Sequence, residues 1–205
     1  HGLEVLQSLV ESRQGGESGV RSVQMLRGPA LWQAADAGRW SPELADAAMA
    51  AEFAANGSKL PPLREMFRVP PWGILITYRD GLRATVLKIG ENSTRWNFAC
   101  KLAGESKPLA TSYYVGPWRN RCLFKAFSHA IQGFIKEGHA PYPVERTLLT
   151  TGMLAAAVDS QSNNEKLIDT PHLNIAYQPV DFRAWREMGA SWKIIGEDVP
   201  EPENV

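Results

Sequence analysis

The sequence lacks the patterns that carry several common protein chemistries. Its 205 residues include only two cysteines, Cys100 and Cys122, and neither belongs to a CxxC motif. The four histidines and two cysteines show no zinc-finger spacing, and a chain of this length needs no disulfide scaffold to bury a core. Both cysteines fall on segments with an apolar pattern, so we expect buried, unreactive thiols.

The chain also has no net charge and no long apolar run. Its 22 lysines and arginines balance 22 aspartates and glutamates, so no basic stripe typical of nucleic-acid-binding proteins is present. No apolar run reaches the length of about 18 residues expected of a membrane-spanning helix, and no signal-peptide pattern is found. We therefore expect no nucleic-acid partner, no membrane segment, and a cytoplasmic location in preference to secretion.

Nucleotide-binding motifs are absent as well. Neither GxGxxG nor GxxxxGK[ST] occurs, and HExxH and GxSxG are also missing. The glycine-rich segment 15–19 follows a predicted helix and precedes a predicted strand, which reverses the order of a dinucleotide site. The 205 residues alone are therefore not expected to bind a nucleotide cofactor or to act as an NAD(P)-dependent dehydrogenase.

The patterns that are present predict strands joined by hairpins. Residues 20–26 alternate as a strand, and residues 72–115 alternate around an Asp80-Gly81 turn in the manner of an antiparallel meander. Strands of this kind, combined with amphipathic helices, predict an α+β fold with an open, mainly antiparallel sheet and helices packed on one face. We expect this domain to span residues 1–180, followed by a partly disordered C-terminal extension over residues 181–205.

Four longer helices are predicted from apolar spacing and capping residues. They cover residues 2–13, 43–55, 120–136 and 143–160. Ser41-Pro42-Glu43 is typical of a helix start, because a hydroxyl caps the first turn and proline follows it. Gly152 lies inside the last helix, where glycine costs about 1 kcal/mol relative to alanine, so we expect another backbone to approach it closely. His129 lies on the third helix, and we expect it to be a partnered core residue.

His1 is the most notable single residue for chemistry. Its α-amino group and imidazole belong to one residue and together could chelate copper if His129, His139 or His172 supplied a further nitrogen. The alternative is that His1 is only the first residue of the chain. Copper bound through His1 is therefore one hypothesis for a cofactor.

Aromatic and arginine side chains gather before the third predicted helix. This cluster consists of Tyr113, Tyr114, Trp118, Arg119 and Arg121. Rings beside guanidinium groups suit a sugar or a carboxylated small molecule, although such a loop also forms for packing alone. We take Tyr114, Trp118 and Arg119 as candidate substrate-binding residues.

His139 and Tyr142 flank Pro141 in a second predicted loop, where they could line a pocket. They are therefore also candidate substrate-binding residues.

The segment from Gly138 to Gly152, Gly-His-Ala-Pro-Tyr-Pro-Val-Glu-Arg-Thr-Leu-Leu-Thr-Thr-Gly, resembles a stretch of the glucose–fructose oxidoreductase-like (Gfo/Idh/MocA) family. There a proline-containing loop leads into a late helix that ends in small residues and serine. The first 26 residues also resemble the family's entry into its C-terminal domain, with a histidine at a helix start and then a strand. The resemblance covers most of residues 1–178 and implies an open antiparallel sheet with helices on one face.

By this resemblance, His1 occupies the position of the family's active-site histidine, a proton-transfer partner for a sugar hydroxyl. Glu4 stands where many members carry an acid and is a candidate pocket residue. The family's Glu-Lys-Pro lysine, the aspartate before the histidine and the nucleotide-binding Rossmann half have no counterpart here. The resemblance thus places NAD(P) in a missing Rossmann domain, upstream in the same protein or on another chain.

Three function hypotheses follow. The first is a substrate-binding and oligomerisation domain of an oxidoreductase-like protein that acts on a sugar, polyol or derivative, with homo-oligomer contacts through the open sheet face. The second is a copper-dependent oxidative enzyme that uses His1. The third is a scaffold or binding module without catalysis.

Overall fold

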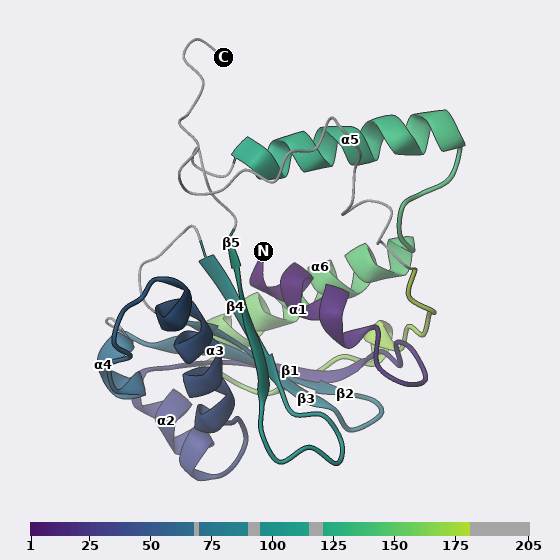
Figure 1. Cartoon of the computed structure of the whole chain (residues 1–205). Helices are drawn as coiled ribbons and strands as arrows, with labels where there is room; N and C mark the ends of the chain where they lie inside the picture. Colours follow the sequence, from purple (N-terminus) through teal and green to yellow (C-terminus); the bar gives the residue numbers. More distant parts are fainter. Residues whose placement is uncertain (68–69, 90–94, 115–120, 181–205) are drawn as a thin grey trace.

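The computed structural model describes residues 1–67, 70–89, 95–114 and 121–180, and these residues form an α+β structure (Figure 1). The main sheet has four strands, β1 (Val20–Arg27), β2 (Trp72–Tyr78), β3 (Arg83–Lys88) and β6 (Ile168–Asp169), in the order β3-β2-β1-β6. All three pairings in this sheet are antiparallel, so the expected fold class, an open and mainly antiparallel sheet, is confirmed.

The hairpin between β2 and β3 turns where the sequence predicts. Gly81 adopts a φ of +92°, a backbone conformation that side chains other than glycine rarely take. The Asp80 carboxylate accepts a hydrogen bond of 3.0 Å from the backbone N–H of Leu82, which fixes the turn. The two strands then pair without interruption from Thr77 with Arg83 to Trp72 with Lys88.

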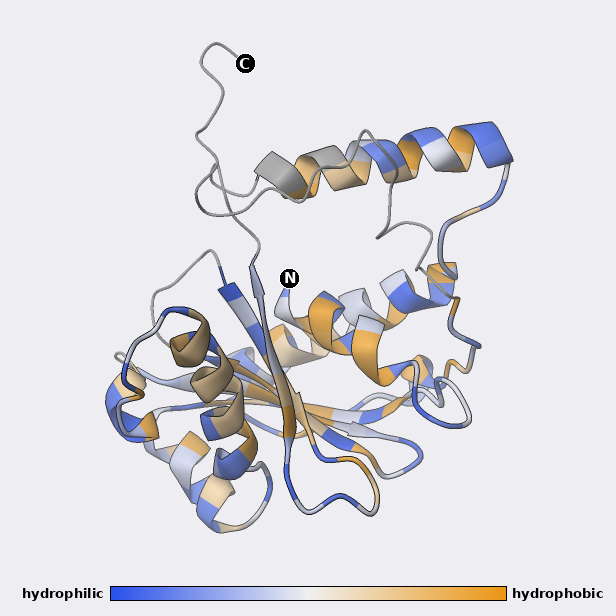
Figure 2. Cartoon of the chain, viewed as in Figure 1, coloured by the Kyte–Doolittle hydropathy of each residue, from blue (hydrophilic) through white to orange (hydrophobic). Residues whose placement is uncertain are grey.

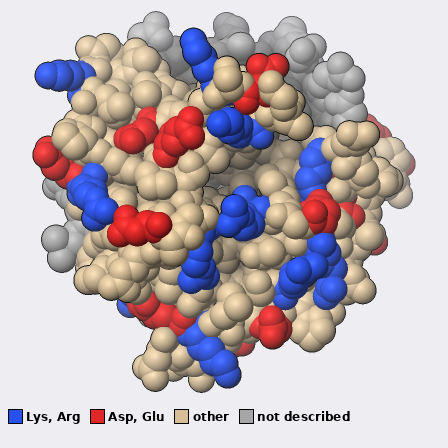
Figure 3. Space-filling model, turned by 90° about the horizontal axis from the view of Figure 1, so that it is seen from below, with Lys and Arg blue, Asp and Glu red and all other residues tan. Residues whose placement is uncertain are grey.

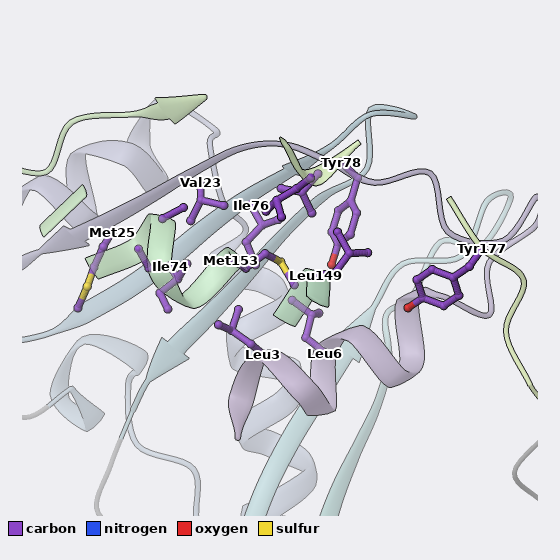
Figure 4. Packing of buried hydrophobic residues seen from close by; sticks show 14 residues of the cluster. Leu3, Leu6, Val23, Met25, Ile74, Ile76, Tyr78, Leu149, Met153 and Tyr177 are labelled. Atoms are coloured by element: carbon purple, nitrogen blue, oxygen red, sulfur yellow. The ribbon is translucent and has the colours of Figure 1, made fainter. Parts of the chain in front are cut away.

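Two helices, α1 (Gly2–Val10) and α6 (Val144–Ser162), cover one face of the main sheet. Alternate residues of β1 and β2 point at them, because successive side chains of a strand face opposite sides. The resulting core contains buried side chains from all four elements, among them Leu6, Val23, Ile76 and Leu149 (Figure 4). Burying each such side chain stabilises the fold by about 1.5–3 kcal/mol.

Gly152 on α6 is closely approached, but by a side chain and not by a backbone. A Cβ added at Gly152 would collide with the buried side chain of Leu173, which ends the short helix η1 (Pro171–Leu173). The expected close contact is therefore present, while the expected backbone partner is wrong. A bulky buried leucine fills the space that a backbone would otherwise take.

A second hydrophobic cluster lies against Leu26 and Leu75, on the sheet face turned away from α1 and α6. It is formed by α2 (Gly28–Asp36), α3 (Pro42–Ala55) and α4 (Leu63–Met66). Ser41 caps α3 as predicted, because its hydroxyl accepts a 3.2 Å hydrogen bond from the backbone N–H of Leu44. The Trp40 indole donates a 2.7 Å bond to the Leu31 carbonyl and ties the cluster together.

The strands β4 (Arg95–Cys100) and β5 (Leu109–Tyr114) form a separate two-stranded sheet. The predicted four-strand meander is wrong here, because β3 pairs with β2 and with no other described strand. The β4–β5 pair packs on α3 instead, and the Asn97 side chain donates a hydrogen bond to the buried Glu52 carboxylate of that helix. Cys100 is only half-buried, although burial raises the pKa of its thiol.

The helix α5 (Arg121–Glu137) forms near its predicted bounds but lies outside the core. It stands apart from the main body in Figure 1, and its apolar stripe is exposed. His129 is therefore half-buried on a projecting helix and is not the core residue expected.

Among the described helices, none combines the length and apolar character needed to cross a bilayer. Residues 181–205, the expected extension, and the Cys122 side chain are outside the described set.

Candidate functional site

The exposed residue His1 lies at the N-terminal end of α1, where its backbone carbonyl accepts the first helical hydrogen bond, 3.0 Å from the N–H of Val5. Its imidazole stacks on the indole of Trp96 from β4, with ring centres 5.3 Å apart and planes inclined by 23°. The separate β4–β5 sheet thus brings an aromatic face to the start of α1.

One turn further along α1, Glu4 faces the helix α6. A Glu4 carboxylate oxygen lies 3.8 Å from a terminal nitrogen of the Arg146 guanidinium. The same guanidinium lies over the Tyr142 ring, 4.8 Å from its centre, which is a favourable cation–π distance. We call the surface formed by His1, Glu4, Trp96, Tyr142 and Arg146 the His1–Arg146 surface.

The Arg146 guanidinium is positioned by hydrogen bonds to the buried carboxylate of Glu11. Its Nε donates a 2.9 Å hydrogen bond to Glu11, and a terminal nitrogen donates a second bond to the other Glu11 oxygen. Glu11 is only 1% exposed and also accepts a 2.6 Å bond from the Tyr177 hydroxyl. Burial acts to lower the pKa of Arg146, but the bonds to Glu11 and the charges of Glu11 and Glu4 raise it overall, so the guanidinium stays charged.

A second buried carboxylate, Glu17, extends this network. It accepts bonds from the side chains of Gln7 and Arg13 at 2.6 and 3.0 Å and from the backbone N–H groups of Ser18 and Gly19. Two backbone hydrogen bonds, one in each direction, join Glu17 to Tyr177. Because the Tyr177 hydroxyl donates to Glu11, this pairing links the Glu17 and Glu11 carboxylates into one network. Each carboxylate is therefore satisfied by protein donors, as buried charges require.

The same network links the helix to the sheet through Gln7. The hydroxyl of the buried Tyr78 donates a 2.9 Å hydrogen bond to the side-chain oxygen of Gln7. The side-chain nitrogen of Gln7 in turn donates a 3.0 Å hydrogen bond to the Tyr177 hydroxyl. We read the buried network as structural, because its members bond mainly to one another, and it reaches surface residues at two places, where Arg146 lies near Glu4 and Arg13 donates to Asp80. Its chemical contribution is to fix the guanidinium position.

The arrangement of the His1–Arg146 surface suits a small polar ligand. The Trp96 and Tyr142 rings offer faces for stacking, Glu4 accepts hydrogen bonds from hydroxyl groups, and the guanidinium is a fixed cation. The His1 imidazole is exposed and can exchange a proton with a bound hydroxyl.

Of the residues that the sequence predicts for a site, Glu4 and Tyr142 are brought together by Arg146, and His1 lies one turn before Glu4 on α1. Tyr114 lies on β5, where the Arg95 guanidinium sits 5.2 Å from its ring centre. His139 is exposed and lies 3.5 Å from the Glu137 carboxylate, between α5 and α6. Trp118 and Arg119 are outside the described residues, as are the side-chain contacts of Arg121.

Sequence reasoning missed the residues that connect these three. Gln7 and Glu11 lie four residues apart on the otherwise apolar face of the first helix, a position where polar side chains need buried partners. That spacing is the signal that a buried network was present. Its partners Arg146 and Tyr177 are more than 130 residues away in the chain, and no local pattern identifies them.

The described residues contain no preformed cluster of metal ligands. Within the described ranges, no group of three or more histidine, cysteine, aspartate or glutamate side chains is arranged to hold a metal ion. Copper bound through His1 and one further histidine stays a prediction.

The other face of the main sheet, which packs on α2, α3 and α4, also carries arginine side chains. Arg83 is the register partner of Thr77 and shares its face, and it donates a 3.0 Å bond to the Gly38 carbonyl. Arg39 donates to the Gln24 side chain on the same face, and Arg21 donates to the carbonyl of Arg79. Figure 3, seen from the side away from α1 and α6, shows lysine and arginine side chains around a hollow near its centre.

No model of a known protein family matches this sequence, and comparisons with curated proteins and with solved structures found no significant match.

Proposed function

We propose that this chain is the substrate-binding and oligomerisation domain of an oxidoreductase-like protein that acts on a sugar, polyol or derivative. The observation that carries the proposal is the His1–Arg146 surface, in which a fixed guanidinium joins Glu4 to Tyr142 and His1 lies one turn before Glu4 on α1. The resemblance to the glucose–fructose oxidoreductase-like family suggests two of these residues, His1 and Glu4, from the sequence alone. In this proposal His1 takes or returns the proton of a substrate hydroxyl.

The proposal places the NAD(P) cofactor on a separate Rossmann domain or chain. The absence of GxGxxG from these 205 residues supports this division. The sheet supports it too, because Rossmann-type sites lie at the carboxyl ends of parallel strands, whereas every described strand pairing here is antiparallel. Homo-oligomer contacts belong to the same proposal.

Calorimetric titration tests the ligand-binding part. Sorbitol, glucose and gluconate represent a polyol, a sugar and a sugar acid. We expect at least one of them to bind, and Tyr142→Ala and Glu4→Gln to weaken that binding about tenfold or more, the effect of losing about 1.4 kcal/mol. His172→Ala is the matched control, because His172 is exposed and lies on η1, outside the His1–Arg146 surface.

Two results would overturn the proposal. One is the absence of binding heat with all three ligands, or equal binding by all variants. The other is saturable binding of NADH by the 205 residues alone, which would contradict the placement of the cofactor on another domain.

A further inference from the structure

We infer that two copies of this chain associate through an apolar surface shared by α5 and the exposed side of α6. This α5–α6 surface consists of Phe124, Phe127, Ile131, Phe134, Ile135, Val144, Leu148, Leu154 and Val158. The inference rests on the oligomerisation part of the proposed function and deepens it by naming the contact.

The helix α5 carries a continuous apolar stripe. Phe124, Phe127, Ile131 and Phe134 follow one another at steps of three and four residues, the spacing that keeps side chains on one face of a helix. These four side chains are 42–71% exposed, and the neighbouring Ile135 is 73% exposed. Figure 2 shows the alternation of hydrophobic and hydrophilic residues along this helix. An amphipathic helix of this kind normally buries its apolar face against another surface.

The helix α6 is apolar on two sides. Leu149 and Met153 are fully buried against the sheet. On its outer side, Val144, Leu148 and Val158 are 53–73% exposed, and Leu154 lies beside them with 53% exposure. A helix that only covered the sheet would carry polar residues at these outer positions.

The connection between the two helices is short and contains two prolines. It spans residues 138–143 and contains Pro141 and Pro143, and Pro143 keeps an extended backbone with φ −60° and ψ 135° immediately before α6. No other described helix or strand packs substantially on α5, which crosses above α1 and α6 in Figure 1. Within the described part of the chain, the apolar stripe of α5 is therefore not covered.

The size of the α5–α6 surface matches a second copy. A fully exposed large apolar side chain presents about 150–200 Å², so the nine residues together leave on the order of 900 Å² exposed. The largest apolar patch of a typical monomer is about 300–600 Å². Two copies would cover about twice 900 Å², within or near the range of about 1,200–2,000 Å² for stable interfaces.

Symmetry and charge also favour a second copy. If α5 of each chain lies on α6 of the other, the two contacts are equivalent and the assembly closes as a dimer. The stripe residues carry no charge. By contrast, the sheet face that carries Arg83 packs on α2–α4, and a symmetric contact there would bring Arg39 and Arg83 of both copies together.

Light scattering after size-exclusion chromatography tests the inference. We expect the unmodified chain to be dimeric, and Phe127→Glu or Leu148→Glu to weaken association about a hundredfold or more. Leu102→Glu is the matched control, because Leu102 is exposed to a similar degree outside the α5–α6 surface, and Arg83→Glu probes the sheet face. Circular dichroism verifies that each variant is folded, and the two helix variants are independent of each other.

The outcomes separate this inference from the proposed function. A dimer that survives both Phe127→Glu and Leu148→Glu but is lost with Arg83→Glu overturns the inference and leaves assembly through the sheet standing. A monomer at concentrations up to about 100 µM overturns both statements about assembly. Neither result changes the ligand titration, because none of these residues belongs to the His1–Arg146 surface.

Discussion

Arg146 is the residue that joins the buried network to the exposed surface. Its pair with Glu11 is almost fully removed from solvent, whereas the pair of Arg64 with Asp36 is exposed on both sides. Removing one partner of a buried pair leaves an uncompensated charge and costs about 3–5 kcal/mol, while an exposed pair contributes about 0–1 kcal/mol. The two pairs therefore provide a matched comparison within one chain.

We predict that Arg146→Gln lowers the free energy of unfolding by about 3–5 kcal/mol and that Arg64→Gln changes it by less than about 1 kcal/mol. Urea denaturation of both variants measures these values. Equal effects of the two substitutions would show that the Glu11 carboxylate does not depend on Arg146.

The buried tyrosines predict how stability depends on alkaline pH. Burial raises the pKa of Tyr78 above its ordinary value of 10.0, and the charge of Glu17 raises it further. Burial also raises the pKa of Tyr177, and the hydrogen bond to Glu11 adds to the rise. A group whose pKa is raised by folding contributes stability that is complete below the unfolded pKa and is lost as the pH rises above it.

We predict that the melting temperature falls as the pH rises from about 9 to about 11, and that Tyr177→Phe makes this fall less steep. Thermal melts followed by circular dichroism across this pH range measure both slopes. At neutral pH, Tyr177→Phe loses the hydrogen bond to Glu11 and is less stable than the parent chain. Identical slopes for the two proteins would mean that Tyr177 does not titrate differently on folding.

The sequence correctly predicted features that depend on residues close together in the chain. The Ser41 cap and the Asp80-Gly81 turn depend on neighbours within three residues, and both are found where predicted. The partner of Glu11 is different, because Arg146 lies 135 positions away. A sequence can show that Gln7 and Glu11 need partners, but it does not show which residues supply them.

At the scale of elements, the contact between α6 and η1 offers a test of packing. Leu173 fills the space above Gly152, so alanine at 152 is overpacked, which typically costs about 1–3 kcal/mol and outweighs the gain in helix propensity of about 1 kcal/mol. Glycine is favoured at position 152 because a Cβ there would collide with the Leu173 side chain.

We predict that Gly152→Ala destabilises the chain by about 1–2 kcal/mol, and that the same change stabilises a chain already carrying Leu173→Ala. A double-mutant cycle measured by denaturation gives the coupling between the two positions. Additive effects would contradict the proposed steric conflict.

The predicted elements were more reliable than their pairing. The expected strands at β2 to β5 all form, yet β4 and β5 leave the main sheet and pack on α3. Alternation of side chains identifies a strand but not its neighbour, and Asn97 finds its partner on Glu52 of α3. Likewise, the apolar stripe of α5 predicts a buried face but does not say whether the covering surface belongs to the same chain.

At the scale of the whole molecule, the fold separates two kinds of surface. The His1–Arg146 surface combines aromatic, acidic and guanidinium groups at the start of α1, while the α5–α6 surface is apolar. The first suits a small hydroxylated ligand and the second suits a protein contact. Ligand binding and association are therefore expected to be separable by mutation.

The most direct test of the account locates the bound ligand on the molecule. Backbone amide shifts in nuclear magnetic resonance spectra of the chain, recorded during titration with sorbitol and with gluconate, report each residue separately. We predict that shifts concentrate at residues 1–5, 95–97 and 142–147, which contain the His1–Arg146 surface. Shifts centred instead on Trp32 and Arg64, which line an open depression beside α2, or the absence of shifts with either ligand, would contradict it.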